Sequence, residues 1–205
     1  MTHLQSNNMK KSFIAIALLF SIGATAQGDF NKRMGEAKAA YAANKLDDAR
    51  FAMQQMIQEL DILTGKDVLK LLPATMDAKP ATTAKDNVSG ASGYVGVIVH
   101  REYGAATDGS NPQLEVITNS PMIGMLNSLL SIPMLGNNQD RKIIKVAGYK
   151  GLVEKTSGSN GKDNYEVQIP ITNSLITLKA PGLPQDKVIE LANAIPVAEI
   201  AKLVQ

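Results

Sequence analysis

The spacing between apolar residues changes once along this chain, and that change limits the fold more than any other feature. From residue 29 to residue 72, apolar residues recur every three or four positions, the period of an amphipathic helix. After residue 93 they alternate with polar residues, the period of a strand with one buried face. We therefore predict an α+β chain in which a helical part comes first and a sheet follows.

The helical part, residues 27–72, is predicted to be a hairpin of two helices with its turn at Asn44 and Lys45. Gly65 is expected to end the second helix, and a short third helix over residues 67–72 is expected to stop at Pro73. The side chains predicted to face inward are Phe30, Met34, Ala37 and Tyr41 in the first helix, and Ala49, Met53, Met56, Ile57 and Leu60 in the second.

The hairpin sequence AYAANKLDDARFAMQQMIQEL, residues 40–60, resembles one tetratricopeptide-type unit. Such units form a stable stack only when about three of them follow one another. No second copy is present in this sequence. The hairpin is therefore expected to pack on the rest of the chain or on a partner.

Residues 73–93 are rich in Ala, Thr, Ser, Gly and Pro and are predicted to be a linker. The sheet domain is expected to span residues 94–205. Its predicted element order is ββαββββα plus one short final helix, which gives an antiparallel sheet covered by helices. The predicted strands span residues 94–103, 114–118, 143–146, 149–155, 164–171 and 174–179, and the predicted helices span 120–132, 186–194 and 197–204.

Three segments of the sheet domain resemble an uncharacterised family of exported bacterial proteins. They are NSPMIGMLNSLLSIPML (119–135), KVAGYKGLVEK (145–155) and LPQDKVIELANAIPVAEIAKL (183–203). The order of sheet and helices is also similar to PsbP-like domains. In that family a helical hairpin like the one ending at Leu71-Leu72-Pro73 precedes the same domain, so the resemblance covers nearly all of the chain after the predicted leader. It implies a fold, but it supplies no activity to transfer.

The start of the chain has the layout of a secretory signal peptide, residues 1–26. From Met9 onward, Lys10 and Lys11 precede an uncharged apolar run over residues 13–22, and Ala24-Thr25-Ala26 offers small residues for cleavage after Ala26. The run is too short to cross a bilayer, so no membrane span is expected after cleavage. We therefore predict a periplasmic or secreted protein.

Charge and composition narrow the function classes. Removing the two leader lysines leaves 19 basic and 19 acidic residues, so no nucleic-acid partner is expected. The chain has no Cys, which excludes disulfides, thiol catalysis and Cys-based zinc sites. No phosphate-binding or dinucleotide-binding motif is present, and we predict no cofactor and no metal.

His100 is the one histidine outside the leader region. A hydrolase would need it beside both an acid and a hydroxyl nucleophile. A structural role is favoured, so we predict a non-enzymatic protein, with a hydrolase as the weakest alternative.

The segment from Pro121 to Gly136 carries no charge and is rich in Met. A helix here either packs on the sheet as core or offers an adaptable apolar surface. Two hypotheses follow. The first is an interaction or structural protein that binds another envelope protein, with the helical hairpin as one contact surface and the domain around residues 121–132 as the other. The second is a carrier of a small apolar ligand between sheet and helix. The residues proposed for this surface are Met122, Ile123, Met125, Leu126, Leu129 and Leu130.

Overall fold

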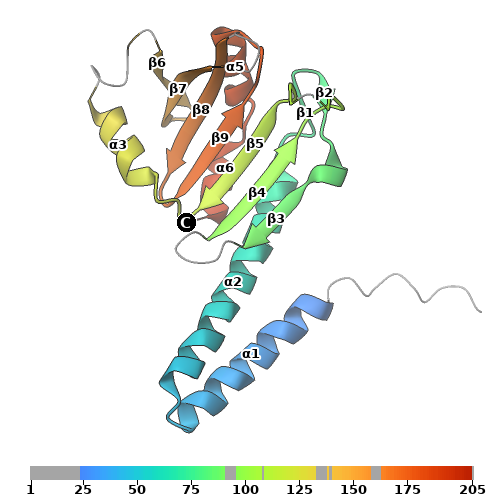
Figure 1. The fold of residues 1–205 in the computed structure, drawn as a ribbon, viewed down its shortest axis with the longest axis vertical. Coiled ribbons are helices and arrows are strands. Elements are labelled where there is room, and N and C mark those ends of the chain that lie inside the picture. The colour runs from blue at the N-terminus through green and yellow to red at the C-terminus, as the bar shows by residue number, and fades with distance from the viewer. Residues whose placement is uncertain are drawn as a thin grey trace, which may run out of the picture.

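The computed structural model describes residues 24–90, 96–107, 109–132, 138, 140–157 and 163–204. The chain has an α+β fold, in which a helical hairpin is followed by a seven-stranded antiparallel sheet with helices on both faces (Figure 1). The predicted fold class is therefore confirmed. The apolar run of the leader lies outside the described residues, and the predicted cleavage point falls within the first turn of α1.

The hairpin consists of α1 (Ala24–Ala42) and α2 (Leu46–Leu71), with Asn44 in the left-handed region at φ 57°. Gly65 does not end the second helix, because α2 continues through it for six more residues. A Cβ at Gly65 would lie 2.8 Å and 2.9 Å from methyl groups of Val88 and Val97. The glycine therefore lets α2 approach the sheet closely, and the predicted third helix is the end of α2.

Residues 73–90 are folded, so the prediction of a linker is wrong for them; residues 91–93 lie outside the described residues. This segment contains a two-stranded ribbon, a 3₁₀ turn and the edge strand of the main sheet. These elements are β1 (Thr75–Met76), β2 (Lys79–Pro80), η1 (Thr83–Lys85) and β3 (Asn87–Gly90). An edge strand contributes mainly backbone hydrogen bonds, which explains why its sequence is poor in apolar residues.

The main sheet has the strand order β3-β4-β5-β9-β8-β7-β6. The predicted order of elements in the sheet domain is confirmed. The strands are β4 (Val97–Glu102), β5 (Gln113–Thr118), β6 (Arg141–Val146), β7 (Tyr149–Ser157), β8 (Asp163–Ile171) and β9 (Ser174–Lys179). The helices are α3 (Ile123–Ser131), α5 (Gln185–Asn193) and α6 (Val197–Leu203).

One face of the sheet is covered by the end of α2 together with α5 and α6, and it holds the main core (Figure 1). Alternate strand residues point into this core, as expected for strands with one buried face. Val97 and Val99 on β4 do so, as their alternation predicts. Fully buried residues of this core include Val68, Leu114, Val116, Val167, Ile169, Ile176, Val188 and Ile200.

The opposite face is covered only in part. There α3 packs over β7 and its neighbours (Figure 1). Leu126 and Leu130 of α3 pack with Leu152 and Leu175 of the sheet in a second, smaller core. Helix α3 begins at Ile123, although Ser120 and Pro121 were expected to begin it. The Ser120 hydroxyl accepts a hydrogen bond from the Met122 N–H at 3.4 Å, so Ser120 caps the turn that leads into α3.

Candidate functional site

His100 lies on β4, on the sheet face that α3 partly covers. Directly paired residues of antiparallel strands point to the same face. The pairing therefore places His100, Glu115, Thr177, Gln168 and Leu152 in one row across five strands. His100 faces Glu115, and Thr177 lies beyond Glu115.

This row does not form a hydrolase relay. In a nucleophile–histidine–acid relay the histidine stands between the other two groups, whereas here the acid stands between His100 and Thr177. Within the described part of the chain, the His100 side chain makes no hydrogen bond to an acid, a serine or a threonine. The geometry thus gives the hydrolase hypothesis no support.

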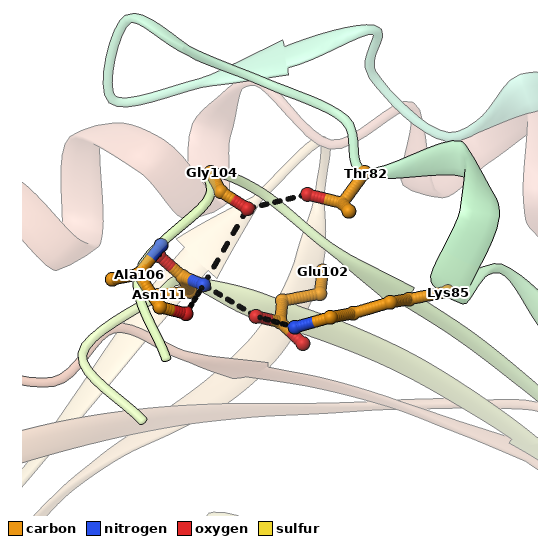
Figure 2. A network of polar contacts seen from close by, with 6 residues as sticks. All are labelled: Thr82, Lys85, Glu102, Gly104, Ala106 and Asn111. Atoms are coloured by element: carbon orange, nitrogen blue, oxygen red, sulfur yellow. Dashed lines mark hydrogen bonds and ion pairs between the residues drawn. The ribbon is translucent and has the colours of Figure 1, made fainter. Parts of the chain in front are cut away.

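Asn111 is the centre of a buried polar network in the loop between β4 and β5 (Figure 2). It is 1% exposed. Its amide oxygen accepts the N–H of Ala106 at 3.2 Å, and its amide nitrogen donates to the Ala106 carbonyl at 2.7 Å. The amide nitrogen also donates to Glu102, whose carboxylate receives a second bond from Lys85 at 2.9 Å.

The same network ties the loop to the segment before β3. The Thr82 hydroxyl donates a hydrogen bond to the carbonyl oxygen of Gly104 (Figure 2). The hydrogen bond from Asn111, followed by that from Lys85, lowers the pKa of Glu102. The chain itself therefore occupies the polar atoms at the centre of this network, and we interpret the cluster as a structural clamp. No group of three or more His, Asp or Glu side chains able to hold a metal occurs among the described residues.

The residues proposed for the Met-rich surface divide between core and solvent. Leu126 and Leu130 are buried, and Ile123 and Leu129 are half-buried against the same cluster. Met122 and Met125 are 38% and 56% exposed. Helix α3 thus packs one side on the sheet and turns the other side outward. The two methionines do not lie between sheet and helix, where the carrier hypothesis would need them.

The hairpin carries the larger apolar surface. Of the eleven large apolar side chains that are exposed in the described residues, seven lie on the hairpin: Tyr41, Leu46, Phe51, Met53, Ile57, Leu60 and Leu63. We call residues 30–63 of α1 and α2 the arm; its turn projects away from the sheet (Figure 1). Tyr41, Met53, Ile57 and Leu60 were predicted to face inward, and that prediction is wrong.

The reason lies in which side of α2 meets α1. Ala49 and Ala52 are buried in the hairpin, because small side chains let two helices approach closely. Met53, Ile57 and Leu60 lie on a neighbouring side, which α1 does not reach. A sequence signal for this surface exists, since α2 carries more apolar residues than contact with a single helix can bury. Met53, Met56, Ile57 and Leu60 were all predicted to face inward.

No described helix is both long and apolar enough to cross a membrane. Comparison with known proteins gives no assignment: no protein-family model, no curated protein and no solved structure matches this chain. The resemblance to exported bacterial proteins stays a prediction from the sequence.

Proposed function

We propose that this chain is an exported, non-enzymatic interaction protein whose sheet domain holds the arm out to a protein partner. The observation that carries this proposal is the exposed apolar surface of α2. Met53, Ile57 and Leu60 are 50%, 59% and 50% exposed, and they follow one another at helical spacing. Contiguous exposed apolar side chains mark interaction sites in folded proteins.

Energetics favour a protein partner for this surface. Fully burying one side chain of this size is worth roughly 1.5–3 kcal/mol, so three or four of them can stabilise a complex substantially. A two-helix hairpin has no further surface of its own with which to bury them. The leader predicted at the start of the chain places the partner in the cell envelope or outside the cell.

Export of the protein from the cytoplasm can be tested separately from partner binding by the arm. The full coding sequence is expressed with its own leader, cells are fractionated, and the mass of the protein is measured. We expect the protein outside the cytoplasm with Gln27 as its first residue. Uncleaved protein confined to the cytoplasm contradicts the export part of the proposal.

Binding is tested by cross-linking in intact cells, comparing the wild type with Ile57→Glu. A charge at this position opposes burial of the apolar surface, so cross-linked protein adducts should disappear. Met125→Glu, at an exposed apolar position on α3, is the matched control and should keep them. Loss of adducts in both variants, or their absence from the wild type, contradicts a role for the arm.

A further inference from the structure

The exposed apolar side chains of α2 form one continuous stripe. At 3.6 residues per turn, Leu46, Met53, Ile57 and Leu60 fall within an arc of about 60° and extend over about 20 Å of helix. Helix α1 covers a different side of α2, where Ala49 and Ala52 are buried. The sheet is approached by another side, through Gly65. The stripe is therefore open along the length of the arm.

Two side chains of opposite charge lie along one edge of this stripe. Arg50 and Asp61 are eleven residues apart, which is close to three helical turns. The Arg50 side chain is 71% exposed. Among the described residues its one ion pair is with Asp47, itself almost fully exposed, at 3.4 Å. Asp61 is half-buried and has no ion pair among the described residues, and its burial raises its pKa. A half-buried carboxylate without a cation nearby is unfavourable, so a cation supplied from outside would stabilise it.

The positions of these residues are self-complementary. Along α2, the midpoint between Arg50 and Asp61 lies between residues 55 and 56. The midpoint between Met53 and Ile57 lies at residue 55, so the two pairs share nearly the same centre. Two antiparallel copies of α2 related by a two-fold axis near this point would bring both pairs together in one register. Arg50 of each copy would then meet Asp61 of the other, twice.

We infer that the arm binds a second copy of this chain, with the two α2 helices antiparallel and their stripes in contact. This inference rests on the proposed function and names the partner. Together with the two α1 helices, the paired arms form a four-helix bundle, which buries what one hairpin leaves exposed. The apolar stripe supplies the contact area, and the two Arg50–Asp61 pairs select the antiparallel register.

Exchanging the charges of Arg50 and Asp61 tests this arrangement. The experiment uses the whole protein, beginning at the first residue that mass spectrometry identifies in the protein isolated from cells. Sedimentation velocity on the wild type, at protein concentrations up to about 100 µM, should show a dimer, because a specific complex with a dissociation constant below this value is then populated. Arg50→Asp places two acids opposite each other in the dimer, and Asp61→Arg places two bases opposite each other. Each variant should weaken dimerisation at least about tenfold.

Recombining the exchanged charges should restore the dimer. An equimolar mixture of the two single variants, and the double variant alone, both place opposite charges face to face again. Lys70→Asp, which makes the same change of charge away from the stripe, is the control and should dimerise like the wild type. Circular dichroism of each variant checks that α2 is still folded. Folded single variants that dimerise as well as the wild type overturn the inference.

Cross-linking gives a second readout. The chain has no Cys, so single cysteines can be introduced without background. Mixing Met53→Cys with Ile57→Cys should give a disulfide between copies, whereas mixing Met53→Cys with Phe51→Cys, which lies off the stripe, should not.

The outcomes separate this inference from the proposed function. A wild-type chain that stays monomeric, while cell cross-linking still captures a different protein on the arm, overturns the second copy and leaves the proposed function standing. A monomer with no adduct on the arm overturns both. Uncleaved protein that stays monomeric, together with cleaved protein that dimerises, also supports the inference.

Discussion

Arg101 on β4 binds Asp86, the residue after η1, through two parallel hydrogen bonds: Nε to Oδ1 at 2.9 Å and Nη2 to Oδ2 at 2.6 Å. Its Nη1 donates to the carbonyl of Leu72 at the end of α2, at 3.0 Å. One guanidinium thus joins the helical hairpin, the segment before β3 and the sheet. The Arg101 and Asp86 side chains are 11% and 12% exposed, so the junction lies away from water.

Asp86→Asn should destabilise the protein strongly. The change leaves the Arg101 guanidinium nearly buried without its counter-charge, which costs about 3–5 kcal/mol. Urea unfolding at pH 7 measures the loss. Glu36→Gln, which removes the partner of Arg33 in an exposed ion pair of α1, is the control and should cost about 0–1 kcal/mol. Similar costs for the two variants would show that the junction is not a buried ion pair.

Gly65→Ala should destabilise the fold although alanine is the better helix former. The added methyl group would lie within 3 Å of Val88 and Val97, and crowding of this kind costs about 1–3 kcal/mol. Gly35→Ala in α1 is the matched control, because a Cβ there meets nothing within 4 Å. It should stabilise the protein by about 0.5–1 kcal/mol. Thermal unfolding of both variants checks the opposite signs, and a stabilised Gly65→Ala would contradict the close approach of α2 to the sheet.

The network around Asn111 predicts a loss of stability in acid. The pKa of Glu102 is lowered in the folded protein, first by the hydrogen bond from Asn111 and then by Lys85. A carboxyl group of this kind stabilises the fold at pH values above its unfolded pKa, near 4.5, and the contribution is lost as the pH falls through the lower folded value.

Glu102→Gln removes this dependence. The wild type should therefore be more stable than Glu102→Gln at pH 7, and the difference should shrink as the pH falls below about 4.5. Urea unfolding at several pH values measures the difference. A gap that does not change between pH 7 and pH 3 would mean that the network does not depend on the charge of Glu102.

The sequence predicts the sheet well because strands and short turns depend on local residues. The hairpin between β6 and β7 is an example: Ala147 and Gly148 both have positive φ, at 49° and 88°, which a two-residue turn of this type requires. The sides of α2 could not be assigned in the same way. A helix that is apolar on two sides does not reveal which side its neighbour covers, so Ile57 was predicted inward and lies exposed.

The same reasoning applies to the edge of the sheet. Val88 belongs to a short strand whose place depends on backbone pairing with β4, and composition carries no signal for such pairing. For the candidate site, the sequence identified helix α3 as unusual. Of the six residues proposed for its surface, Leu126 and Leu130 are buried in the smaller core and two more are half-buried against it. The sequence predicted that the hairpin packs on the rest of the chain or on a partner, but it did not predict which of its side chains are exposed. Exposure depends on what packs nearby, which no local pattern records.

Tyr103 should make the stability of the folded protein depend on pH in the alkaline range. Its side chain is fully buried, and its hydroxyl has no hydrogen-bond partner among the described residues, although it lies close enough to Arg101 to interact with its charge. Burial raises its pKa to about 12, from 10.0 for a free tyrosine. Above pH 10 the unfolded chain releases this proton before the folded protein does, so the wild type should lose stability as the pH rises from about 10 to about 12.

Tyr103→Phe removes that contribution and leaves no buried hydroxyl unpaired. At pH 7 its free energy of unfolding should be unchanged or higher by up to about 1 kcal/mol. Between pH 10 and pH 12 it should lose less stability than the wild type. Tyr41→Phe, at an exposed position on the arm, controls for the loss of a hydroxyl at pH 7. A large loss of stability in Tyr103→Phe at pH 7 would instead show that the hydroxyl is bonded in solution, with Arg101 as the nearest donor.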